Sequence, residues 1–187
     1  MPTLQAGAEI KLSKKIAWYN EAGIKYTKGF SDHYADTSFI KSKGYKLKSE
    51  IRYYFKSREP ISLDGMYVAA NVFYVKDFHN RAITYGNMSD TSHKIDNFGV
   101  KKNVFGFNLL FGYQKAMTKK LCFEVYAGVG IRLRNINTVN EEYNKNTDYI
   151  FTATDPKVSE IGQSVDANAG SSVAPNFTLG LRLGFKL

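Results

Sequence analysis

The sequence contains one cysteine, Cys122, and only four prolines among 187 residues. A single cysteine excludes an internal disulfide and a cysteine-based metal cluster. The chain also lacks any run of about 18 apolar residues, so the sequence predicts no transmembrane helix. That absence leaves membrane β-barrels open, because barrel strands alternate apolar with polar residues and escape such a criterion.

Aromatic residues and glycine are what the chain has in quantity. Thirteen Tyr, thirteen Phe and fifteen Gly favour a β-rich protein, and the length suits a single domain over residues 1–187. The net charge of +9 is compatible with nucleic acid, anionic lipid or simple solubility, and charge alone does not choose among them.

Strict alternation of large apolar and polar residues recurs along the chain. It is clearest at the carboxyl end, where NFTLGLRLGFKL places an apolar side chain at every second position. Successive strand side chains point to opposite faces, so this period predicts β-strands. Seven strands and no helix are predicted, over residues 4–12, 16–28, 45–55, 66–76, 104–114, 121–134 and 176–187.

The links between these strands alternate in length. Compact charged turns run from Leu12 to Lys15, Lys56 to Gly65 and Lys115 to Lys120. Long polar links fall between them, at 30–44, 80–102 and 135–175. Up-and-down transmembrane barrels have this arrangement, with short periplasmic turns and long outer loops.

The volume of the apolar face indicates which way it points. An eight-stranded barrel has an interior just wide enough for side chains to fill, and five or six large apolar residues per strand would overfill it. The polar face mixes glycine with charged residues that can interdigitate and pair in a narrow lumen. We therefore predict an outward apolar face and a charge network in the lumen, made of Glu9, Glu21, Lys25, Lys48, Glu50, Arg52, Glu124, Arg132, Arg134 and Arg182.

Within that network each glutamate is expected to meet Lys or Arg, since an unpaired buried carboxylate is costly. The basic residues outnumber the glutamates, so some belong at the rims. Arg134 and Lys46 are expected at the outer rim, and Lys11 and Lys186 at the periplasmic end.

Three segments resemble the small OmpA/OmpX-like outer-membrane β-barrel proteins of bacteria. They are VFGFNLLFGYQ at 104–114, AGVGIRLR at 127–134 and the terminal FTLGLRLGFKL. The last resembles the carboxyl-terminal signal that the barrel-assembly machinery reads, with Phe185 as its late aromatic, although the chain ends on Lys186 and Leu187. The resemblance implies an all-β, up-and-down antiparallel transmembrane barrel in the bacterial outer membrane. It also implies contact with membrane lipid and lipopolysaccharide, and with the assembly machinery during insertion.

The number of strands is odd, whereas single-chain bacterial barrels usually have an even number. No signal peptide precedes the first strand either. We expect eight strands in the full-length protein, with the first strand and the leader lost by truncation or a misplaced start. The alternative is that DYIFTA, residues 148–153, supplies the eighth strand.

Other functions fit the sequence less well than a membrane barrel. His33, His79 and His93 lie in or beside long links, without metal-ligand spacing or a catalytic motif, so we predict no enzyme activity, metal or cofactor. Tyr45 and Tyr53 lie on the face opposite the nearby lysines, which disfavours nucleic-acid stacking. The prediction is a monomeric outer-membrane protein with a structural or surface-interaction role. A soluble, lipocalin-like barrel that carries a small apolar ligand is the alternative.

Overall fold

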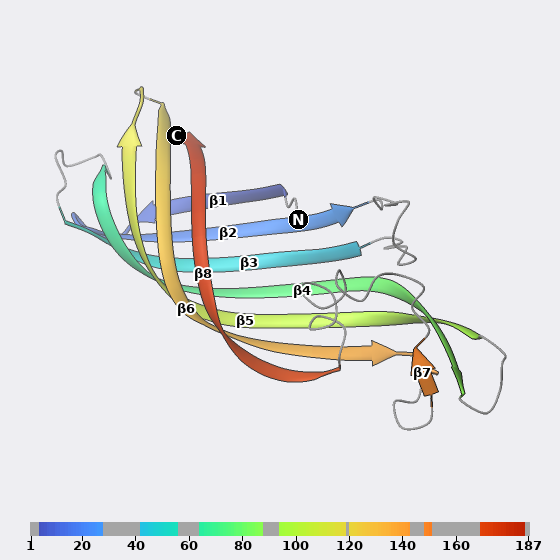
Figure 1. Cartoon of the computed structure of the whole chain (residues 1–187). Helices are drawn as coiled ribbons and strands as arrows, with labels where there is room; N and C mark the ends of the chain where they lie inside the picture. The colour runs from blue at the N-terminus through green and yellow to red at the C-terminus, as the bar shows by residue number, and fades with distance from the viewer. Residues whose placement is uncertain are drawn as a thin grey trace.

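A computed structural model describes residues 4–27, 42–55, 64–87, 94–118, 120–142, 148–150 and 169–185. They form one strongly curved, all-β sheet (Figure 1). Its strands are β1 (Leu4–Lys11), β2 (Ile16–Thr27), β3 (Ser42–Tyr54), β4 (Gly65–Asn87), β5 (Lys94–Ala116), β6 (Leu121–Val139), β7 (Asp148–Ile150) and β8 (Gly170–Phe185). Within the described ranges, no helix is long and apolar enough to cross a membrane.

The seven long strands pair in chain order, β1-β2-β3-β4-β5-β6-β8, and every pairing is antiparallel. This confirms the up-and-down meander predicted from the sequence. The predicted closed barrel is not seen, because β1 and β8 are the two edges of an open sheet. Because the number of alternating strands is odd, β1 and β8 run in the same direction and cannot pair antiparallel with each other.

The eighth strand lies in the segment that the sequence offered as an alternative, but it does not close the sheet. β7 pairs with the far end of β4, Asp148 opposite Asn87 and Ile150 opposite Tyr85. It therefore lies away from the open edges, where Figure 1 shows it beside the end of β4.

All three predicted long links are partly strand, and β3 begins at Ser42, inside 30–44. β4 and β5 continue through most of 80–102, and β6 and β8 extend into 135–175, which corrects the predicted boundaries. These extensions carry few apolar residues, so an apolar alternation does not reveal them. They are held by backbone pairing and by a small buried cluster of Phe98, Val100 and Ile136.

The two faces of the sheet differ sharply, as the sequence predicted. We call the buried face the inner face and the other the outer face. The outer face carries an exposed apolar belt in which Leu109 is 59% and Leu179 85% exposed. The belt includes Leu47, Ile51, Val68, Val72, Phe105, Phe107, Leu109, Phe111, Val129, Ile131, Leu133, Phe177, Leu179, Leu181 and Leu183.

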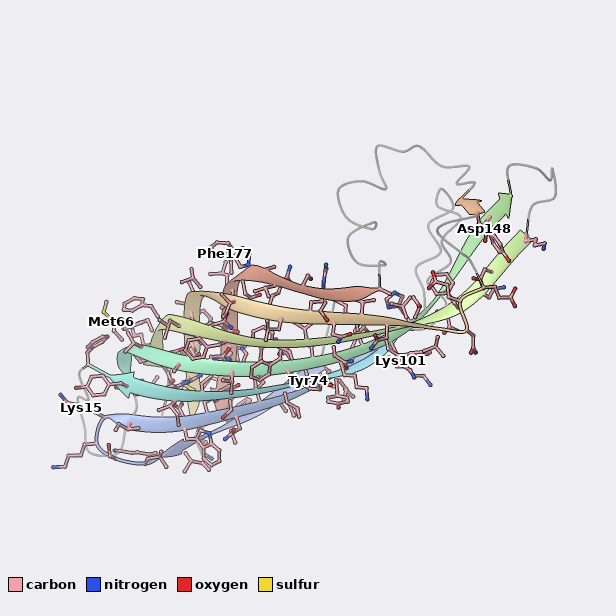
Figure 2. All side chains as sticks on the ribbon, turned by 90° about the horizontal axis from the view of Figure 1, so that it is seen from below. Lys15, Met66, Tyr74, Lys101, Asp148 and Phe177 are labelled. Carbon is pink, nitrogen blue, oxygen red and sulfur yellow. The ribbon has the colours of Figure 1, made fainter. Side chains whose placement is uncertain are left out.

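Two of the predicted compact turns are built alike. The Ser13 hydroxyl accepts the backbone N–H of Ile16 between β1 and β2. The Thr118 hydroxyl accepts that of Leu121 between β5 and β6. Lys15 and Met66 lie at this short-turn end and Asp148 at the opposite, long-link end (Figure 2). The short link 56–63 lies outside the described residues.

Candidate functional site

Near the short-turn end, the inner face holds a cluster of charged side chains that we call the charged core. Its members come from five strands and are Glu9, Glu21, Lys48, Glu50, Arg52, Glu124 and Arg182. They lie together because each occupies an inward position of its strand and the sheet curves around them. Arg52 and Glu50 have fully buried side chains.

Arg52 on β3 ties neighbouring and distant strands together. Its Nη2 lies 2.8 Å from Glu50 Oε2, and its Nη1 lies 3.1 Å from Glu124 Oε2 on β6. The same Nη1 lies 3.3 Å from Glu9 Oε1 on β1. One guanidinium thus meets three carboxylates, which its five N–H donors allow.

Arg182 on β8 makes the complementary set of contacts. Its Nη1 lies 2.6 Å from Glu124 Oε1, its Nη2 2.7 Å from Glu50 Oε1, and its Nε 3.1 Å from Glu21 Oε2. Glu50 is on β3 and Glu21 on β2, so this side chain reaches from one edge strand to the far side of the sheet. The curvature brings the two halves of the sheet face to face.

Lys48 supplies the third cation of the charged core. Its Nζ lies 3.6 Å from Glu50 Oε1 and 3.7 Å from Glu21 Oε1. These distances exceed hydrogen-bond length, and Glu21 Oε1 has no hydrogen-bond partner among the described residues. Each of the four glutamates thus has a cationic partner, and four carboxylates face three cations.

Tyrosines complete the charged core. Tyr67 donates a 2.6 Å hydrogen bond to Glu124, and Tyr54 donates one of 2.8 Å to Glu9. The Tyr19 hydroxyl donates to Glu21 at 3.0 Å. Both arginines also lie over the Tyr19 ring, with guanidinium carbons 4.2 Å and 4.4 Å from its centroid. Such cation–π contacts suit a guanidinium that is already shielded from water.

Glycines make room for these rings. Tyr67 lies over Gly112 of the next strand, and Tyr126 lies over Gly180, so that a Cβ at either glycine would overlap the ring. The glycines on the inner face therefore leave space that the neighbouring tyrosine rings fill. This is the interdigitation that a narrow interior requires.

The charged side chains of the charged core pair mainly with one another. Every carboxylate in it accepts hydrogen bonds or ion pairs from cations or tyrosines, and the arginine side chains are 0% and 11% exposed. No group of three His, Cys, Asp or Glu side chains in the described ranges is placed to hold a metal ion. The charged core fills the space inside the curved sheet, and its ion pairs link strands that are not neighbours in the sheet.

Residues 1–158 match the family described as "Protein of unknown function (DUF3575)". The chain belongs to this family. No curated protein and no solved structure matches it. The DUF3575 match covers the charged core from Glu9 to Glu124 and ends before β8, which carries Arg182.

Three residues of the predicted network lie elsewhere in this DUF3575 protein. Lys25 pairs with Asp77 at 2.7 Å, Arg132 is exposed, and Arg134 Nε donates to the Ser172 hydroxyl at 3.2 Å. Arg132 lies eight positions beyond Glu124 on β6, about 27 Å at ~3.4 Å per residue. Side chains on the same face of the sheet can therefore lie far apart along the strands. The inner face carries charged residues at two separate levels along the strand direction.

Of the predicted rim residues, Lys46 is half-buried, with Nζ 3.4 Å from Gln5 Oε1. Lys186, His33 and His93 lie outside the described residues. His79 has its Nδ1 3.8 Å from Asp77 Oδ2, beside the Lys25 pair.

Sequence reasoning did not include Tyr19, Tyr54, Tyr67 and Tyr126 in the network. All four occupy inward positions two residues from a charged-core member or opposite a glycine, and that spacing could have revealed them.

A chain of amides between the two charged levels was also missed. Asn176 donates to Asn108 at 2.7 Å, and Asn108 donates to Asn71 at 2.9 Å. Asn176 reaches across β6 because the intervening residue is Gly130, where a Cβ would collide with the Asn108 amide and the Phe107 carbonyl.

Proposed function

We propose that this protein is an integral β-barrel of the bacterial outer membrane with a structural or surface-interaction role and no enzymatic activity. In this proposal the outer face contacts lipid, the charged core plugs the lumen, and the long links lie outside the cell.

The main support for the proposal is the order of residue types along the outer face of β5. Beyond Ile95, which is exposed at the long-link tip, its outward residues are first polar, then apolar, then basic: Asn97, Gly99, Lys101, Asn103, Phe105, Phe107, Leu109, Phe111, Tyr113 and Lys115. The apolar stretch from Phe105 to Tyr113 has the ~9–11-residue length of a transmembrane β-strand. A polar–apolar–polar sequence along one exposed face is what a strand that crosses a bilayer needs.

The inner face changes in the opposite sense at the same boundary. Beyond Asn103 the inward residues of β5 include the buried Phe98 and Val100, whereas beside the belt they are Gly106, Asn108, Gly112 and Gln114 with one apolar residue, Leu110, among them. The extension has a water-soluble pattern, apolar inside and polar outside. The belt has the reverse pattern, which suits lipid outside and a packed polar interior.

The open edges indicate how the proposed barrel closes. Unpaired backbone groups are not tolerated in the hydrocarbon core, so β1 and β8 need partners there. Both run toward the short-turn end, and one strand that runs oppositely would pair antiparallel with each. A strand connected to the start of β1 through the long-link end would have this direction, giving eight long strands.

The partners of such a protein follow from its setting. We propose outer-membrane lipid and lipopolysaccharide as permanent neighbours, and the barrel-assembly machinery during insertion. The barrel would be a monomer, because its charged core is complete within one chain, and nucleic acid has no part in it.

Membrane fractionation tests the proposal. The full-length polypeptide, secreted behind a signal peptide in a Gram-negative host, is expected to sediment with the outer membrane. It should resist urea extraction and dissolve in detergent. Recovery in the soluble periplasm, with stability in the absence of detergent, would reject the membrane barrel. That result would favour the lipocalin-like carrier, although such a carrier needs apolar side chains on its inner face.

A further inference from the structure

Three lysines gather on the outer face at the long-link end of the apolar belt. They are Lys43 on β3, Lys76 on β4 and Lys101 on β5, and we call them the lysine triangle. Lys43 and Lys101 lie directly on either side of Phe78 in the strand register, and Lys76 is two residues before Phe78 on the same face. Two strand spacings separate Lys43 from Lys101, about 10 Å between backbones.

The three ammonium groups have no carboxylate partner among the described residues. The nearest carboxylate along the chain, Asp77, points to the inner face and pairs with Lys25. Their described neighbours on the outer face are Tyr45, Asn103 and Asn137, which carry no charge. Like charges on adjacent strands repel one another, so an anion bound among them would relieve an unfavourable arrangement.

The lysine triangle lies just beyond the long-link end of the apolar belt. The next row toward the short-turn end holds Tyr74 and Phe105, which begin the apolar belt, and the Tyr45 and Tyr74 rings lie 6.0 Å apart. Figure 2 shows Tyr74 at the edge of the belt and Lys101 beyond it toward the extension. Phe78, 38% exposed, stands in the middle of the lysine triangle. Cations just beyond an aromatic row match the depth at which lipid phosphates lie.

We infer that Lys43, Lys76 and Lys101 bind the phosphates of a phosphorylated glycolipid headgroup in the outer leaflet, with Phe78 against its sugar or first methylenes. The inference rests on the proposed membrane barrel. The flexible lysine stems can bring their ammonium groups onto one phosphate or onto two phosphates of one headgroup. The belt below the triangle takes the acyl chains of the same lipid.

Native mass spectrometry of the full chain in zwitterionic detergent tests this, with diphosphorylated lipid A and the same lipid without its phosphates as probes. The wild type is expected to retain the phosphorylated form selectively. Lys43→Gln/Lys76→Gln/Lys101→Gln should raise the apparent dissociation constant by roughly fivefold per lysine removed. The control Lys14→Gln/Lys15→Gln/Lys120→Gln removes the same charge from exposed turns at the other end and should change it little.

Three outcomes would overturn the lysine triangle as a lipid site. They are equal retention of both lipid forms, equal losses in the two triple variants, and displacement of the lipid by inorganic phosphate at matched phosphate concentration. Protease protection in phosphatidylcholine vesicles is measured in parallel. A protein that inserts there without preferring the phosphorylated lipid refutes only the lysine triangle, whereas failure to insert refutes the barrel and the triangle together.

Discussion

At the scale of single residues, Arg52 and Arg182 determine how the inner face is filled. Between them they contact all four glutamates of the charged core, and both lie against Tyr19. A buried ion pair gains little over an apolar pair of the same volume, but removal of one partner leaves the other charge uncompensated. The charged core is therefore sensitive to the loss of any one member.

Glu124→Ala is expected to lower the free energy of unfolding by about 3–5 kcal/mol, because Arg52, Arg182 and Tyr67 all lose their contacts with it. Glu124→Gln should cost less, since the amide oxygen still accepts a hydrogen bond. Reversible urea unfolding in detergent micelles measures both. Asn97→Ala, at an exposed position of β5, is the control and should leave stability unchanged. Wild-type stability of Glu124→Ala would show that the charged core does not form.

At the scale of elements, the strands that extend beyond the apolar belt serve two environments. β5 passes from a water-exposed extension into the apolar belt without a break in its pairing to β4 and β6. The alternation of inward and outward side chains continues along the whole strand, and only the residue types change. One strand therefore sets both the proposed membrane boundary and the length of the hairpin beyond it.

Leu109→Arg and Val129→Arg are expected to impair folding into a bilayer by roughly 2–4 kcal/mol each, because both side chains lie in the middle of the belt. Asn97→Arg is the matched control, on the same strand and face as Leu109 but beyond the belt. Folding into phosphatidylcholine vesicles, followed by gel mobility without heating, measures the yield. Equal yields for all three variants would contradict the assignment of the outer face to lipid.

At the scale of the whole molecule, the charged core joins the two edges of the sheet. Glu9 of edge strand β1 pairs with Arg52, and Arg182 of edge strand β8 pairs with Glu50. Arg52 and Glu50 pair with each other on β3, which links the two edges. The curvature is thus maintained by side chains as well as by backbone pairing. In the proposed barrel, an interior crossed by such contacts would leave no open path for solutes.

Planar-bilayer recording of the purified protein is therefore expected to show no large, steady, porin-like conductance. The physical reason is that the described ion pairs fill the interior at the level of the charged core. Arg52→Ala/Arg182→Ala should increase the frequency of brief openings, since it removes both guanidinium groups. Steady conductance by the wild type would reject the plug.

The sequence by itself determined the seven long strands, their up-and-down order, and which side chains share a face. These follow from a period of two residues and from turn chemistry, both local properties of the chain. The same parity placed Glu9, Glu21, Glu50 and Glu124 on one face with Arg52 and Arg182. The DUF3575 match covers most of this pattern, residues 1–158.

Only the tertiary structure decided which of those side chains meet. Lys25, Arg132 and Arg134 share the inward parity but lie at another level of the sheet, and this depends on the stagger between strands. Gly128 shows the same dependence: it is a small inward residue in the sequence, yet a Cβ there would collide with Leu110 and the Leu109 carbonyl. Which face a side chain points to is determined by its position within one strand. Register, curvature and free volume depend on the contacts between strands, so these three properties are decided only when the sheet is assembled.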